Sequence, residues 1–195
     1  MKLINFYDYA LAASCTLKRK KTDGDNIGHF GFGVVTEFFE LDRALKNYDK
    51  VNLSEECGDS MWYLANHALY HFSDDKEFFK NLTRDIWHAQ YTLLPPKTVF
   101  LDYQKYVEEY GDIAKKYFLT NKRISGYDKK VKDLISKMIR CLASIQLYLD
   151  IRPAQTLSNN INKLKDRYGS KFDDYLCFNR DLIKEYSALK SGIDE

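Results

Sequence analysis

The chain has 195 residues, of which 45% are apolar and 30% charged, which is typical of a folded globular protein and excludes a disordered one. Its 30 basic and 28 acidic residues nearly balance, so duplex nucleic acid is disfavoured as the main partner and no stable nucleic-acid binding is expected. No apolar run reaches the roughly 18 residues of a membrane span. The four scattered cysteines form no CxxC pair, so we expect free thiols in a cytoplasmic protein.

The first half of the chain predicts three helices. Residues 3–16 are expected to form the first, and the basic, then glycine- and aspartate-rich stretch 18–33 is expected to be a loop. The second helix is expected at 33–47, because apolar residues recur there at spacings of four, three and four. The third is expected to open at about residue 53, with acids in its first turn, and to end near residue 72.

The second half is also expected to be helical. The aromatic-rich segment 73–105, which contains adjacent prolines, is expected to form short helices and a loop inserted into the domain. Further helices are expected at 104–119, 128–149, 153–168 and 173–189. Because helix breakers are few, the sequence predicts one all-α domain over 1–195, a helical bundle with an insertion at about 73–105.

The two halves carry a weak internal similarity. The segment "EEYGDIAKKYF" resembles "TEFFELDRALK", so that Glu109 and Asp112 repeat the acids of the second helix. The helix that follows has the same spacing of apolar residues as the third helix, but Leu134 and Lys137 stand where the third helix has its acids. This pattern indicates a degenerate duplication of a two-helix unit, or only the likeness that any two amphipathic helix pairs share.

Two pairs of acids stand among apolar residues on neighbouring helices. Glu37 and Glu40 flank the apolar stripe of the second helix, and Glu56 and Asp59 lie on one face of the third. Four carboxylates that converge repel one another, and a hard divalent cation such as Mg²⁺ relieves that repulsion. The spacing therefore favours a magnesium site for a polyphosphate; the alternative is a solvated, salt-bridged acidic edge.

Three motifs occur in an order that resembles a known family. They are Glu-x-x-Glu at 37–40, Glu-x-x-Asp at 56–59 followed by Trp62-Tyr63, and "NINKLKDRY" at 160–168, with "FNRDL" after it. In this order they resemble the MazG-type all-α nucleoside triphosphate pyrophosphohydrolases of the dimeric dUTPase-like superfamily, closest to versions carried by bacterial viruses. The resemblance covers about 29–72 and 125–182. The chain departs from the family at Phe38 and Phe39, where small residues are usual.

The resemblance implies hydrolysis of a (deoxy)nucleoside triphosphate to the monophosphate and pyrophosphate, as in cleansing of the nucleotide pool. It implies Mg²⁺, for which Mn²⁺ can substitute, held by Glu37, Glu40, Glu56 and Asp59. Either Glu37 or Glu40 is expected to act instead as general base on the attacking water. In a virus-encoded protein, the site of action would be the host cytoplasm.

Five further residues are candidates for substrate binding. Lys163 and Arg167 lie one turn apart on a predicted helix, with Asn160 a turn before, and their cations suit phosphate oxygens. The alternative for the two cations is a solvent-facing pair at a helix C-terminus. Tyr63 shares the carboxylate face, and His29 opens the second helix, so both are expected near the base. The alternative for His29 is a plain residue of the helix cap region.

Two questions of function and assembly stay open in the sequence. The bulky Phe38–Phe39 pair and the acid-poor second unit allow a non-catalytic helical module that binds nucleotides or a protein. Family members build sites from more than one subunit, so a homodimer or tetramer is expected, unless the duplication lets one chain supply both halves. The base and sugar of the substrate are not identified by any residue.

Overall fold

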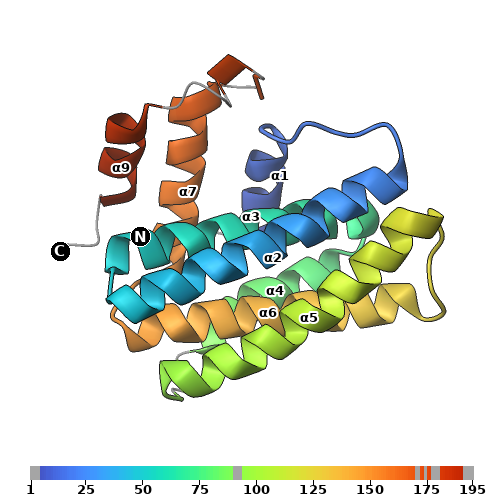
Figure 1. Ribbon diagram of the computed structural model, residues 1–195, viewed down its shortest axis with the longest axis horizontal. Coiled ribbons are helices and arrows are strands. Elements are labelled where there is room, and N and C mark those ends of the chain that lie inside the picture. The colour runs from blue at the N-terminus through green and yellow to red at the C-terminus, as the bar shows by residue number, and fades with distance from the viewer. Residues whose placement is uncertain (1–4, 90–93, 170–171, 174, 177–180, 191–195) are drawn as a thin grey trace.

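The computed structural model describes residues 5–89, 94–169, 172–173, 175–176 and 181–190. Every regular element in these ranges is a helix, so the predicted all-α fold is confirmed (Figure 1). The helices are α1 (Phe6–Ser14), α2 (Asp23–Asn47), α3 (Lys50–Phe72), α4 (Lys76–His88), α5 (Pro96–Thr120), α6 (Tyr127–Tyr148), α7 (Pro153–Tyr168) and α9 (Leu182–Lys190). None of them is both long and apolar enough to cross a bilayer.

A two-residue link makes α2 and α3 an antiparallel hairpin. The α2 helix ends at Tyr48, whose backbone is left-handed with φ of 55°, and whose N–H donates to carbonyls of the last turn. Asp49 follows and caps α3, because its side chain accepts a hydrogen bond from the Asn52 N–H. The reversal therefore takes two residues and returns the acids of α3 alongside those of α2.

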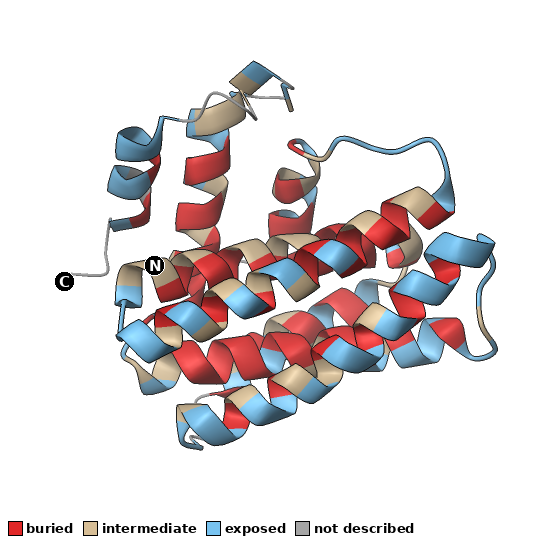
Figure 2. Cartoon of the chain, in the orientation of Figure 1, coloured by how far each residue is buried: buried red, intermediate tan, exposed pale blue. Residues whose placement is uncertain are grey.

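The α2–α3 hairpin packs on a second pair, α5 and α6, and α4 lies against α6. Figure 1 shows α1, α7 and α9 standing across the long helices on the other side of α3. Buried residues line the facing sides of α2, α3, α5 and α6, and the outer sides are exposed (Figure 2). One continuous cluster of buried apolar side chains runs from Phe6 in α1 to Leu157 in α7.

The predicted loop at 18–33 is wrong over most of its length, because α2 already begins at Asp23. Three glycines of this segment lie in α2 and form its contact with α5. Gly24, Gly28 and Gly31 face α5, and a Cβ added to Gly31 would lie 2.3 Å from the Cβ of Ala114. Their spacing of four and three residues places all three on one helical face. The glycines thus let α5 approach the α2 backbone closely.

Two further boundaries differ from those predicted. The helix expected at 104–119 begins at Pro96, since proline is favourable at a first helical position, and its buried side includes Val99 and Tyr103. The segment expected to be an insertion therefore contains α4 and nearly the first three turns of α5, whose apolar residues belong to the main core. Of the tail helix expected at 173–189, the structure describes residues 175–176 as helical and then α9 from Leu182, and residues 174 and 177–180 lie outside the described ranges.

The repeated acids of the second unit do not gather. Glu109 is exposed, and Asp112 is exposed and pairs with Lys116 on its own helix. Leu134 is buried in the core, and Lys137 pairs with Asp133. The second helix pair therefore supplies packing against the first pair, and no acidic cluster of its own.

We expect Gly31→Ala to lower the free energy of unfolding by roughly 1–3 kcal/mol, because its new methyl group would overlap that of Ala114. Exchanging the pair, as Gly31→Ala with Ala114→Gly, should restore stability to within about 1 kcal/mol, since one methyl group again fills the contact. Urea denaturation followed by circular dichroism measures both changes.

Gly111→Ala is the matched control. A Cβ there would lie 3.2 Å from a terminal methyl of Val35, which can move, so this variant should be close to neutral. If Gly31→Ala is as stable as the wild type, the close approach of α2 and α5 is not the reason for the glycine.

Candidate metal centre

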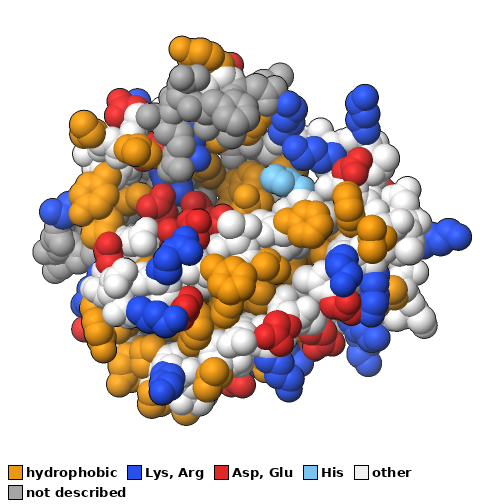
Figure 3. Space-filling view, in the orientation of Figure 1, with side chains coloured by type: hydrophobic (Ala, Val, Ile, Leu, Met, Phe, Trp, Pro, Cys, Tyr) orange, Lys and Arg blue, Asp and Glu red, His pale blue; other side chains and the backbone are white. Residues whose placement is uncertain are grey.

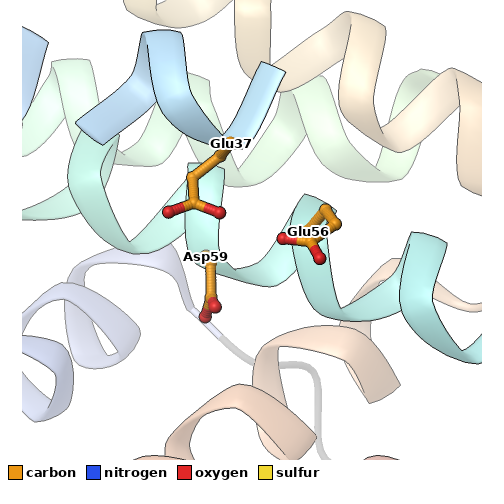
Figure 4. A group of neighbouring side chains, drawn as sticks. All are labelled: Glu37, Glu56 and Asp59. Carbon is orange, nitrogen blue, oxygen red and sulfur yellow. The ribbon is translucent and has the colours of Figure 1, made fainter. Parts of the chain in front are cut away.

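Three carboxylates from two helices meet at one point. Glu37 extends from α2 toward Glu56 and Asp59 of α3 (Figure 4). One oxygen from each side chain lies within 4.8 Å of one from each of the others. Glu56 is buried, whereas Glu37 and Asp59 are partly exposed. Three of the four predicted acids therefore come together, as a group that could hold a metal ion; we call it the carboxylate triad.

A close contact between α2 and α3 lies one turn before Glu37. Gly33 packs directly on the ring of Tyr63, and a Cβ at Gly33 would lie 2.2 Å from that ring. Any larger residue would therefore push the ring or the helix away. The glycine that the sequence suggested as part of a loop instead sets the distance between the two helices that carry the triad.

The triad holds more negative charge than its surroundings balance. Burial, followed by the charge of Asp59, raises the pKa of Glu37 from 4.5 to about 10, and Glu37 also hydrogen-bonds to Glu56. Burial also raises the pKa of Glu56 to about 7, although its hydrogen bond with Glu37 works in the opposite direction. At neutral pH Glu37 is therefore protonated and donates to Glu56.

Asp59 is held from the other side by α7. Lys163 is completely buried, and its Nζ lies 2.7 and 2.6 Å from the two carboxylate oxygens of Asp59 and 3.2 Å from Oε1 of Glu55. Asn160 donates to Oδ1 of Asp59 over 2.6 Å and accepts a hydrogen bond from the Tyr9 hydroxyl at 3.0 Å. These contacts fix the direction of the Asp59 carboxylate and join α1, α3 and α7 around it.

Two other acids lie near the triad but outside it. Glu40 lies at the rim, is 41% exposed and pairs with Arg43 at 3.3 Å. Glu55, which sequence reasoning missed, reaches Lys163 from the same face of α3. Glu55 could have been identified from the sequence, because it lies four residues before Asp59 and residues four apart share a helical face.

The triad lies in a hollow of about 660 Å³, here called the acidic hollow. Besides the five acids, its lining includes Lys18, Lys20, His29, Trp62, Tyr63 and Arg167. Figure 3 shows acidic side chains gathered on this face of the molecule, near a histidine and several hydrophobic groups. The hollow thus combines oxygen ligands, cations and aromatic rings, and its volume falls in the range of small-molecule sites.

Three rings form one wall of the acidic hollow. The His29 ring meets Tyr63 edge to face at 5.5 Å and Trp62 at 6.3 Å. Trp62 is held by its indole N–H, which donates to the Ala13 carbonyl at 3.2 Å and to the Thr16 hydroxyl at 3.1 Å. Burial, followed by the charge of Lys20, lowers the pKa of His29, so this ring is neutral at pH 7. A neutral, fixed aromatic wall suits a planar ligand.

Arg167 lines the acidic hollow but is already paired. Its Nε donates to Glu185 of α9 over 2.7 Å, and its second terminal nitrogen also contacts that carboxylate. Both side chains are largely buried. The sequence placed Arg167 as a phosphate ligand and did not identify Glu185, because eighteen residues and a chain reversal separate the two.

The donor set of the triad fits a hard divalent cation. All its ligand atoms are carboxylate oxygens, which Mg²⁺, Mn²⁺ and Ca²⁺ prefer, and no thiol or imidazole belongs to the group. Glu37 and Glu56 share a proton, and a bound cation would replace the positive charge of that proton. We searched family models, curated proteins and solved structures for relatives of this chain, and none matched.

Glu37→Gln is expected to stabilise the cation-free protein at pH 8 while removing its response to Mg²⁺. Unfolded glutamates ionise near pH 4.5, but folded Glu37 keeps its proton to about pH 10, so the folded state loses stability as the pH rises between these values. Glutamine avoids that loss. Each kcal/mol gained should raise the melting temperature by about 2–4 °C.

Thermal melts at pH 6 and pH 8, with and without Mg²⁺, measure the effect. In the wild type the ion should raise the melting temperature more at pH 8, because its binding must displace fewer protons there. Glu109→Gln is the control: it removes an exposed acid from the matching position of the second unit and should change neither result. An equal Mg²⁺ response in Glu37→Gln would contradict the assignment of Glu37 as a ligand.

Proposed function

We propose that the chain hydrolyses a (deoxy)nucleoside triphosphate to the monophosphate and pyrophosphate with Mg²⁺ as cofactor. The observation that carries this proposal is the convergence of Glu37, Glu56 and Asp59 in a hollow that also contains cations and aromatic rings. A polyphosphate with its cation fits the acids, and a base fits the ring wall. The family resemblance of the three motifs points to the same reaction.

The triad would hold the cation, with Glu40 at the rim within reach of the same ligand. Bound there, Mg²⁺ would supply neutralisation of phosphate charge and activation of water. Of the two acids considered for the general base, Glu40 is the better candidate, because it lies outside the triad while Glu37 is assigned as a ligand of the cation.

The polyphosphate tail would meet cations at the edge of the acidic hollow. Lys18 and Lys20 line it, and both belong to the basic run between α1 and α2. Lys163 and Asn160 act on Asp59, so in this proposal they position a metal ligand instead of contacting phosphate directly. His29 and Tyr63 would bind the base, with Trp62 beside them.

The oligomeric state stays a prediction. The three carboxylates of the triad all belong to one chain, and α5 and α6 pack on α2 and α3 as a second helix pair. A dimer or tetramer is expected from the family resemblance, and a monomer if the second pair takes the place of a partner. Light scattering coupled to size-exclusion chromatography separates these outcomes.

A second candidate function is nucleotide binding without turnover. Two observations favour it: Lys163 is bound to Asp59 and Glu55, and Arg167 is bound to Glu185, so neither cation faces the hollow unpaired. A module of this kind would bind nucleotide and Mg²⁺ in titration calorimetry and release no pyrophosphate.

We expect Mg²⁺-dependent pyrophosphate release from at least one member of a panel of dNTPs and NTPs that includes dUTP and modified bases. Glu56→Gln and Asp59→Asn should each lower kcat by on the order of 10² or more, because each removes a charged ligand at the reacting phosphates. Helical circular dichroism shows whether each variant is folded.

Glu109→Gln again serves as the control and should retain full activity. Unchanged turnover in both Glu56→Gln and Asp59→Asn would refute the triad as the catalytic centre. Binding of nucleotide with no pyrophosphate from any member of the panel would favour the second candidate function.

A further inference from the structure

A second hollow lies between α1 and α4, and its lining differs from that of the acidic hollow. Its volume is about 530 Å³. Its lining includes three cationic residues of α4, one histidine and three aromatic rings: Lys76, Lys80, Arg84, His88, Tyr7, Phe79 and Trp87. No acidic side chain lines it, so its charge suits an anionic ligand. We call this site the α4 groove.

The charges of α4 are separated between its two sides. Asp75 pairs with Lys132 of α6 at 2.6 Å, and Asp85 pairs with Arg140 of α6 at 2.9 Å. These acids attach α4 to α6 and leave the basic residues on the outer side. Within the described ranges, Lys76 and Arg84 pair with no carboxylate, and Lys80 has only a contact of 3.8 Å with exposed Glu77. The near-neutral charge of the whole chain therefore conceals a basic surface.

Lys76, Lys80 and Arg84 recur at every fourth position, and His88 continues this row to residue 88. At about 1.5 Å per residue, neighbours lie about 6 Å apart along the axis and the whole row covers about 18 Å. All four side chains belong to exposed residues. A row of this length exceeds the phosphates of one mononucleotide and matches an extended polyanion with regularly spaced charges.

The N-terminus of α1 forms one side of the α4 groove. The Phe6 N–H donates to the Thr83 hydroxyl of α4 at 3.0 Å, so the start of α1 abuts the middle of α4. This contact also fixes the position of α1 relative to α4, so the two sides of the groove are held together by the fold.

Two rings give the α4 groove a surface for bases. Tyr7 is half-buried and packs edge to face on Phe79, with ring centres 5.0 Å apart. Trp87 is half-buried at the other end of the basic row. Stacking on aromatic rings next to a row of cations is the usual way in which proteins bind single strands without sequence preference.

We infer that the α4 groove binds single-stranded nucleic acid, with the basic row along its phosphates and Tyr7 and Trp87 against its bases. Duplex DNA is a poorer ligand, because its bases are already stacked on one another. The inference is independent of the proposed hydrolysis, which uses the acidic hollow on α2 and α3.

Fluorescence anisotropy of the full chain with labelled 20-mer oligo(dT) and oligo(rU), in EDTA to remove divalent cations, tests the inference. We expect binding of the single strands that weakens with salt, and tighter binding than to a duplex of equal length. Lys76→Ala with Arg84→Ala should weaken it about tenfold or more and reduce the salt slope by about 1.4, at about 0.7 per phosphate contact.

Lys129→Ala with Lys130→Ala is the matched control, since it removes two exposed charges from α6 and should leave binding unchanged. The chain has two tryptophans, so in a Trp62→Phe background the strand should quench the fluorescence of Trp87. Absence of single-strand binding, equal affinity for duplex, or equal loss in both double variants would each overturn the inference. Loss of pyrophosphate release would leave it intact.

Discussion

One buried ammonium group organises the candidate centre. Lys163 is fully enclosed, binds both oxygens of Asp59 and reaches Glu55, so it connects α7 to the face of α3 that carries the acids. A buried cation without its partners is costly, and removal of one partner from such a pair typically costs about 3–5 kcal/mol. The pairing therefore holds α7 in place, and it leaves Glu37 and Glu56 as the acids that lack an internal cation. This imbalance is the reason that they share a proton.

The fold supports that centre through contacts made by small residues. α2 approaches α5 along Gly24, Gly28 and Gly31, and approaches α3 at Gly33. The second helix pair contributes no acids to the triad, but it forms the surface on which α2 lies. The α2–α3 hairpin carries the carboxylate triad, and the α5–α6 pair supports that hairpin. The crossing helices α1 and α7 orient Asp59 through Tyr9, Asn160 and Lys163.

Periodicity predicted the helices whose apolar stripes are regular, including those near 128–149 and 153–168, and residue spacing predicted that acids of α2 and α3 would meet. Sequence reasoning failed at 18–33, because a glycine is equally consistent with a loop and with a close contact between two helices. Only the position of the partner helix distinguishes these two cases. Sequence reasoning also failed for Glu55 and Glu185, whose roles depend on the cations opposite them. Arg167 was identified, but its partner, which decides what it can bind, came from a distant segment.

The glycine face of α2 and the carboxylate of Glu37 lie on one uninterrupted helix, and this has a consequence for how the chain can vary in length. A residue inserted or deleted between Gly31 and Glu37 would rotate everything beyond it by about 100° and shift it by about 1.5 Å. The glycines up to Gly31 would still pack against α5, but the Glu37 side chain would point away from α3. The number of residues between Gly31 and Glu37 is therefore fixed by two contacts at once, that of α2 with α5 and that of Glu37 with the acids of α3.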